Sequence, residues 1–219
     1  PFAGLNMAFH PSRCLVVGPS WVGDMVMAQS LFIALKQRFP DLAIDVLAPA
    51  WSKPMLAAMP QVRDAIEMPL QHGELALATR YRLGKQLRAK QYDWAIVLPR
   101  SLKAALVPSW AKIPVRTGYK GEMRYGLLTD IRPLDKSVLT MTVQRFVTLG
   151  LPQNAALPPA IEPPRLQVSA AECAAVRQQF LGNTAQRVLA LCPGAEYGGA
   201  KRWPAEYFAA VAQHWIAQG

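Results

Sequence analysis

Short apolar runs alternate with longer mixed segments along most of the chain, and the two patterns predict strands and helices in turn. Residues 13–17, Arg-Cys-Leu-Val-Val, are apolar after the first position and stop at Gly18, which is typical of a buried strand. Further strands are predicted at 43–47, 65–68, 93–98, 115–118 and 187–192. Helices are predicted at 24–39, 51–59, 73–91, 101–112 (with a break at Pro108), 140–149, 169–180 and 204–218. Strands that alternate with helices predict βαβ units, and so an α/β fold with a parallel sheet.

A proline-dense stretch at 152–164 divides this pattern into two parts. Proline stiffens the chain and blocks regular structure, so we expect one domain at 13–150, a linker at 151–168 and a second domain at 169–219. Ser169 and Glu172 have the spacing of a capping box at the start of the next helix. The second part holds a single predicted strand, which cannot form a sheet alone, so we expect that domain to be incomplete.

Composition places the chain among globular proteins with an anionic partner. Hydrophobic residues make up 52% of the 219 residues and charged residues 17%, which excludes global disorder. The formal charge of +10 suggests nucleic acid, an acidic membrane or phosphorylated small molecules. No apolar run approaches the roughly 20 residues that span a bilayer, and no secretory signal is evident. Cys14, Cys173 and Cys192 are odd in number and widely spaced, which predicts reduced, buried thiols, with Cys14 and Cys192 in core strands.

The first candidate site is the loop after the first predicted strand, Gly18-Pro-Ser-Trp-Val-Gly-Asp24. In a parallel sheet, this loop lies at the carboxyl end of a strand, where ligands bind. It lacks the G-x-G-x-x-G spacing and has Asp24 where a phosphate loop has lysine, so it is not a nucleotide loop of either kind. A carboxylate at a helix N-terminus stays ionised and can accept a proton from a hydroxyl nucleophile. The alternative is that Asp24 only caps the helix.

The second candidate site is the glycine-rich loop Cys-Pro-Gly-Ala-Glu-Tyr-Gly-Gly-Ala-Lys-Arg-Trp-Pro at 192–204. It leads into a predicted helix, whose N-terminus attracts anions. Lys201 and Arg202 add positive charge at that point, which predicts a phosphate or diphosphate ligand. A flexible basic turn is the alternative.

Other cations form a third group. The helix predicted at 73–91 carries five cations, which we expect to form an exposed, solvated face rather than a binding site. They are Arg80, Arg82, Lys85, Arg88 and Lys90. Lys103 and Arg124 lie near strand ends and glycines and are better candidates for binding an anion. No Asp-x-Asp pair is present, so no carboxylate-held metal is predicted, and the three histidines are scattered. Charge is the only signal for nucleic-acid binding.

Taken together, four segments resemble the ADP-heptose:lipopolysaccharide heptosyltransferases. They are 18–25, Ala-Pro-Ala-Trp at 48–51, Gly-Tyr-Lys-Gly-Glu-Met-Arg-Tyr-Gly at 118–126, and 192–204, in the same order and spacing. The resemblance implies a GT-B fold with two Rossmann-like domains. The N-terminal domain would hold the lipopolysaccharide inner-core acceptor and the C-terminal domain would hold ADP-heptose. It also implies inverting transfer that needs no metal or other cofactor.

The resemblance also assigns roles to single residues. Asp24 matches the base that deprotonates a hydroxyl of the first heptose, and Lys201 matches the lysine that neutralises the leaving diphosphate. The implied donor contacts are Gly194, Ala195 and Glu196. The implied acceptor contacts are Ser20, Trp21, Lys103 and Arg124. Because this acceptor is anionic and sits in the inner leaflet, we expect a cytoplasmic protein peripheral to the inner membrane, and no nucleic-acid partner.

Two alternatives stay open at this point. The segments favour the type II members of the family, but a type I or another core heptosyltransferase, with a different acceptor, would carry similar motifs. Family members extend beyond Gly219, and the strands that would hold adenine and ribose follow that point. The second alternative is therefore a non-catalytic fragment that binds an anionic glycolipid.

Overall fold

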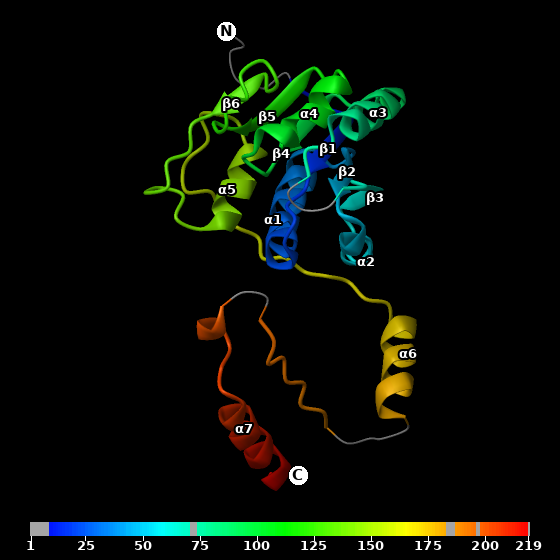
Figure 1. Cartoon of the computed structure of the whole chain (residues 1–219), viewed down its shortest axis with the longest axis vertical. Helices are drawn as coiled ribbons and strands as arrows, with labels where there is room; N and C mark the ends of the chain where they lie inside the picture. Colours follow the sequence, from blue (N-terminus) through cyan, green and yellow to red (C-terminus); the bar gives the residue numbers. More distant parts are fainter. Residues whose placement is uncertain (1–8, 71–73, 183–186, 196–197, 219) are drawn as a thin grey trace. The chain divides into compact units, whose positions relative to one another are not determined.

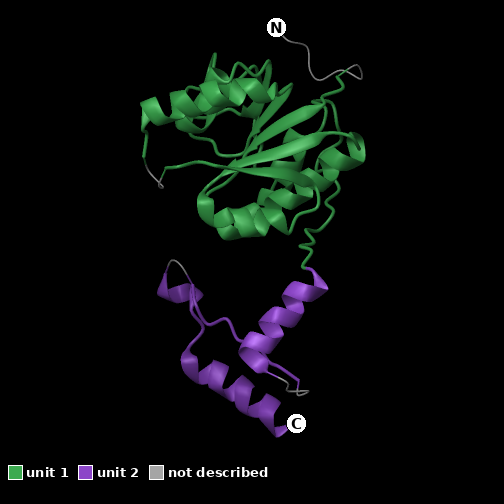
Figure 2. Ribbon diagram, turned by 90° about the vertical axis from the view of Figure 1, so that its right-hand side faces the viewer, with its two compact units in different colours: residues 1–168 green, residues 169–219 purple. Residues whose placement is uncertain are grey.

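A computed structural model describes residues 9–70, 74–182, 187–195 and 198–218. The chain divides into two compact units, residues 1–168 and residues 169–219, coloured separately in Figure 2. The first unit contains a β-sheet. The described residues of the second contain only helices and irregular segments.

The first unit is built on a six-stranded, parallel sheet (Figure 1). Its strands are β1 (Arg13–Val17), β2 (Ala43–Ala48), β3 (Val62–Glu67), β4 (Trp94–Val97), β5 (Val115–Tyr119) and β6 (Asp130–Arg132). Their order across the sheet is β3-β2-β1-β4-β5-β6. The chain moves outward from β1 to β3 and then returns to β4 to continue in the other direction. The reversal lies between β1 and β4, where ligand sites form in open α/β sheets.

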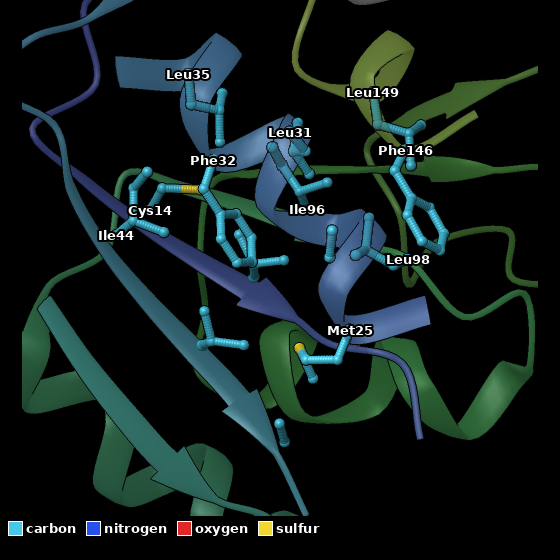
Figure 3. Close-up of a cluster of buried hydrophobic side chains, with 14 of the residues drawn as sticks. Cys14, Met25, Leu31, Phe32, Leu35, Ile44, Ile96, Leu98, Phe146 and Leu149 are labelled. Atoms are coloured by element: carbon cyan, nitrogen blue, oxygen red, sulfur yellow. The ribbon is translucent and has the colours of Figure 1, made fainter. Parts of the chain in front are cut away.

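Helices cover both faces of this sheet (Figure 1). They are α1 (Val22–Arg38), η1 (Ala50–Ser52), α2 (Lys53–Ala57), α3 (Leu77–Leu87), η2 (Arg88–Lys90), α4 (Leu102–Trp110) and α5 (Thr142–Leu149). Alternate residues of β1 belong to two separate cores. Cys14 and Val16 belong to the core that includes side chains of α1 and α5, and Figure 3 shows Cys14 beside Phe32 of α1. Leu15 and Val17 belong to the core that includes side chains of α3 and α4. Burial on both faces explains why this strand is apolar at four consecutive positions.

The predicted elements of the first unit are present, most of them with shifted ends, and two details differ. The strand β6 was not predicted, because Asp130–Arg132 is short, polar and at the edge of the sheet. The break predicted at Pro108 is wrong, because α4 continues to Trp110. Pro108 has no backbone N–H, so the helix continues past it with one backbone hydrogen bond fewer.

The proline-rich segment forms no helix or strand, yet its end is attached to the first unit. The Gln29 side chain, fully buried on α1, forms two hydrogen bonds with the backbone of Arg165, at 2.8 and 2.9 Å. The Gln167 N–H donates to the carbonyl of Ala58 at 2.7 Å. The boundary between the units therefore falls after Val168, at the end of the predicted linker.

The second unit contains α6 (Ala170–Leu181), η3 (Gly199–Lys201) and α7 (Ala205–Ala217). The capping box of α6 is confirmed, since Ser169 and Glu172 exchange side-chain-to-backbone hydrogen bonds. The strand predicted at 187–192 is wrong: no strand is present there, nor elsewhere among the described residues of this unit to pair with it. The predicted burial of Cys192 and Cys173 is also wrong, because both are exposed, whereas Cys14 is buried in β1 as predicted.

Candidate functional site

A cavity of about 860 Å³ opens in the first unit at the carboxyl ends of β1, β2 and β4. The loops that follow these strands supply much of its wall. The side chains and backbone that line it include Gly18, Ser20, Trp21, Asp24, Trp51, Arg80, Pro99, Arg100, Ser101, Lys103, Tyr119, Lys136 and Arg145. The cavity thus lies at the reversal of strand order, where an α/β sheet binds its ligands.

Asp24 is placed in the cavity by the first turn of α1. The N-cap position of this helix is held by Trp21, and no side chain caps it, so the structure does not support the alternative that Asp24 serves only as a cap. Asp24 is half-buried and lines the cavity wall. Within the described part of the chain, its carboxylate makes no ion pair and no side-chain hydrogen bond. A carboxylate that lines a cavity without a partner can accept a proton from a ligand.

Positive charge is concentrated in the wall of the same cavity. Among the described residues that line it, Asp24 is the only acid and five are cations: Arg80, Arg100, Lys103, Lys136 and Arg145. Arg145 donates to the carbonyls of Leu139 and Thr140, which fixes its guanidinium group. Lys103 and Lys136 form no ion pair among the described residues. A cavity with this charge distribution suits a ligand that carries several negative groups.

Arg80 is a site residue that the sequence analysis assigned to a solvated helix face, which is wrong. The residue is 5% exposed, and its guanidinium group donates to the carbonyls of Leu75, Glu74 and Lys103. Burial lowers the pKa of Arg80, and Glu74 partly opposes that effect. A signal was available: Arg80 shares a helical stripe with Leu87, seven residues later, and that stripe is buried. Arg82 and Lys85 are exposed, as predicted.

Three of the four predicted acceptor residues line the cavity, and the fourth lies behind its wall. Ser20, Trp21 and Lys103 are lining residues, but Arg124 is not. The Arg124 side chain is 2% exposed and donates hydrogen bonds to the carbonyls of Pro99, at 2.7 Å, and Tyr119.

Pro99 and Tyr119 both line the cavity. Arg124 therefore stabilises the cavity wall from the side that faces the protein interior. Burial, with a further contribution from Arg100, lowers the pKa of Arg124 to about 10, so the group stays charged at neutral pH.

The predicted donor residues belong to the second unit. Gly194 and Lys201 are exposed, Ala195 is partly buried, and Glu196 lies outside the described residues. The Arg202 guanidinium donates to the carbonyl of Ala195 at 3.3 Å, which links the two ends of this loop. Their assignment to a donor site stays a prediction. Across the described ranges, no three His, Cys, Asp or Glu side chains come together as a metal site.

The family follows from comparison with known proteins. Residues 80–219, more than half of the chain, match the family model of glycosyltransferase family 9 (heptosyltransferase). The chain belongs to this family. The match begins at Arg80 in α3 and includes the glycine-rich loop at 192–204.

Relatives within family 9 agree with this assignment. The chain is 49% identical to lipopolysaccharide heptosyltransferase 2 of Escherichia coli (strain K12) and 50% identical to lipooligosaccharide heptosyltransferase 2 of Haemophilus influenzae. Each match covers 94% of this chain but only 61% of the relative. The structure of E. coli ADP-heptose lps heptosyltransferase II is similar, with a TM-score of 0.85 at 45% identity, over 94% of this chain and 62% of that one. The predicted α/β fold of GT-B type is thereby confirmed.

Proposed function

We propose that this chain carries the acceptor site and the catalytic base of a heptosyltransferase that acts in lipopolysaccharide core synthesis. The single observation that carries the proposal is the cavity at the sheet reversal, whose described lining combines five cations with the Asp24 carboxylate, which has no partner among the described residues. A base must be ionised and accessible, and an acceptor rich in phosphate and carboxylate groups needs cations around it. The names of the relatives, which are heptosyltransferases 2, favour the first heptose as acceptor over the acceptor of a type I enzyme.

The reaction would proceed by direct displacement. Asp24 takes the proton from a hydroxyl of the acceptor heptose while the hydroxyl oxygen attacks the anomeric carbon of ADP-heptose. The bond from that carbon to the diphosphate breaks, ADP leaves, and attack on the opposite side inverts the anomeric centre. Lys201 would neutralise the diphosphate as it leaves, and the loop with Gly194, Ala195 and Glu196 would hold the donor.

The acceptor would lie among the lining residues of the first unit. Lys103 would pair with an anionic group of the inner core, and Ser20 and Trp21 would contact the sugar. Arg124 would act indirectly, because it holds the carbonyls of two lining residues. None of the described helices is long and apolar enough to cross a bilayer. Cations around the cavity would instead bring a cytoplasmic protein to the anionic surface of the inner leaflet.

The test compares one variant from each unit in a full-length family member that carries this sequence. For Asp24→Asn we expect heptose transfer to fall by about 10²–10⁴-fold, with ADP affinity unchanged in calorimetric titration. For Lys201→Ala we expect ADP to bind about tenfold or more weakly, because a charged contact to the diphosphate is lost. Asp41→Asn is the matched control: Asp41 is an exposed carboxylate that does not line the cavity. Full activity of Asp24→Asn would contradict the base assignment.

A non-catalytic glycolipid-binding chain is the competing function. It predicts that the acceptor binds normally to wild type and to Asp24→Asn, but that neither protein transfers heptose. The accessible carboxylate in the cavity favours the catalytic reading, because a binding site for an anion gains nothing from an acidic group in its wall.

A further inference from the structure

Two tryptophans occupy equivalent positions in neighbouring strand-to-helix connections. In the register of the sheet, Val17 of β1 is paired with Leu47 of β2. Trp21 follows Val17 by four residues, and Trp51 follows Leu47 by four residues. Both side chains line the cavity, and each is 43% exposed. Large aromatic side chains are usually well buried, so this matched pair at the cavity wall calls for a ligand.

The backbone that carries Trp51 is fixed by local hydrogen bonds. Trp51 is the middle residue of η1, and the next residue, Ser52, is fully buried. The Ser52 N–H and hydroxyl both donate to the carbonyl of Pro49, at 3.0 and 2.7 Å. These short-range hydrogen bonds fix the turn from which the partly exposed indole lines the cavity.

Trp21 lies close in sequence to the candidate base. It is the N-cap residue of α1, and Asp24 follows three residues later, in the first turn of the helix. Both residues line the cavity. A ring bound against Trp21 would therefore share this cavity with the carboxylate that would take its proton.

We propose that Trp21 and Trp51 form a stacking platform for a saccharide ring of the acceptor, which presents one of its hydroxyls to Asp24. The inference rests on the proposed function. One face of a sugar ring presents C–H bonds, whose hydrogens carry a small positive charge. The face of an indole ring carries a partial negative charge, so the two faces attract each other. The five cations can hold the anionic substituents of the acceptor, but a neutral ring offers them no charge. The platform supplies the missing contact and fixes which hydroxyl is near the base.

The test uses a full-length family member that carries this sequence and two soluble probes. One is a lipopolysaccharide inner-core oligosaccharide freed of its lipid, and the other is ADP. For Trp51→Ala we expect oligosaccharide affinity to fall about tenfold in calorimetric titration, with ADP affinity unchanged. Trp51→Phe, which keeps an aromatic face, should recover most of that loss. Tyr125→Ala is the control, because Tyr125 is 62% exposed and does not line the cavity.

Each outcome separates the platform from the proposed function. No binding of the oligosaccharide to wild type would overturn the acceptor site, and the platform with it. Normal oligosaccharide binding by Trp51→Ala would overturn the platform alone. Loss of ADP binding without loss of oligosaccharide binding would assign the indole to the adenine ring and also overturn the platform. A loss of binding in both Trp51→Ala and Trp51→Phe, with unchanged melting temperature, would show that the indole acts through something other than an aromatic face.

Discussion

The two units of this chain form helices in different ways. Helix α1 in the first unit has no side-chain cap, yet it runs for 17 residues and buries Met25, Leu31 and Phe32 among its apolar positions. Helix α6 in the second unit has a complete capping box, yet none of its residues is buried. The first helix is stabilised by packing against the sheet, and the second by local hydrogen bonds. Good local signals therefore make a helix, but they do not make a core.

The apolar residues of the second unit sharpen the contrast. Trp203, Tyr207 and Val211 recur at intervals of four residues, and each remains at least 41% exposed. Trp203 stacks on Tyr207 with ring centroids 5.4 Å apart, so these side chains contact each other without leaving solvent. In the first unit, the corresponding periodic residues of α1 lie under the sheet (Figure 3). Apolar residues recur along the helices of both units. They are buried only in the first unit, where a sheet covers them.

The largest expected effect separates two tryptophans, one from each unit. Trp94 of β4 is fully buried, donates to the Thr117 hydroxyl at 2.8 Å and meets the ring of Phe39 edge-on. Trp94→Ala should lower the free energy of unfolding by about 3–5 kcal/mol, because it leaves a large cavity. Trp203→Ala removes a half-exposed ring and should cost below about 0.5 kcal/mol.

Urea unfolding of the whole chain, followed by circular dichroism, measures both changes. If Trp203→Ala proved as costly as Trp94→Ala, the second unit would possess a core of its own, and the contrast drawn above would fail.

The next effect concerns the attachment of the linker to the first unit. Gln29→Ala removes both hydrogen bonds to the Arg165 backbone and leaves those groups without their partner, which should cost about 1–3 kcal/mol. The amide of Arg165 should lose protection in hydrogen exchange. Gln61→Ala is the matched control, since Gln61 only accepts one hydrogen bond from the Gln29 amide, at 3.1 Å. Unchanged protection in Gln29→Ala would mean that the linker is held elsewhere and that the boundary between the units is not fixed by this amide.

Local patterns were enough to predict much of this fold. The strand β1 could be predicted to the residue because burial on both faces leaves only apolar positions, and the capping box of α6 because its two residues lie three apart. The strand at 187–192 could not be judged in this way, because a strand exists only where another strand pairs with it. The sequence analysis missed β6 because its residues are polar and form a strand only through pairing with β5.

The site was predictable to a similar degree. Asp24, Trp21 and Lys103 follow the ends of predicted strands. In a parallel sheet, ligands bind at the carboxyl ends of the strands, so such residues can be identified from the sequence alone. Lys136 and Arg145 reach the same cavity from the segment after β6, more than a hundred residues along the chain from Asp24. No local pattern contains that information, because it depends on the order of strands across the sheet.

The smallest expected effect compares two carboxylates with the same local chemistry. Asp93 accepts hydrogen bonds from the N–H and hydroxyl of Ser12, at 2.7 and 2.6 Å, and Glu172 accepts the same pair from Ser169, at 2.9 and 2.6 Å. Burial by itself would raise the pKa of Asp93, but the hydrogen bonds from Ser12 and Arg13 outweigh it and lower the pKa on balance. Hydrogen bonds from the Ser169 hydroxyl and N–H lower the pKa of Glu172.

A lowered carboxyl pKa means stability that is complete above the ordinary value of about 4 and is lost as the pH falls through the lowered value. Asp93, the residue before β4, accepts hydrogen bonds from Ser12, 81 residues earlier, so its protonation should destabilise the whole first unit. Glu172 accepts its hydrogen bonds from a residue only three positions earlier, so its protonation should affect α6 alone. Asp93→Asn should therefore cost about 1 kcal/mol at neutral pH and flatten the fall of melting temperature below pH 4. Glu172→Gln should leave the melting temperature of the first unit unchanged and reduce only the helicity of α6. Thermal unfolding of both variants between pH 3 and 7 decides the point: an equal flattening by Glu172→Gln would mean that α6 unfolds together with the sheet, and that the two units are one cooperative structure.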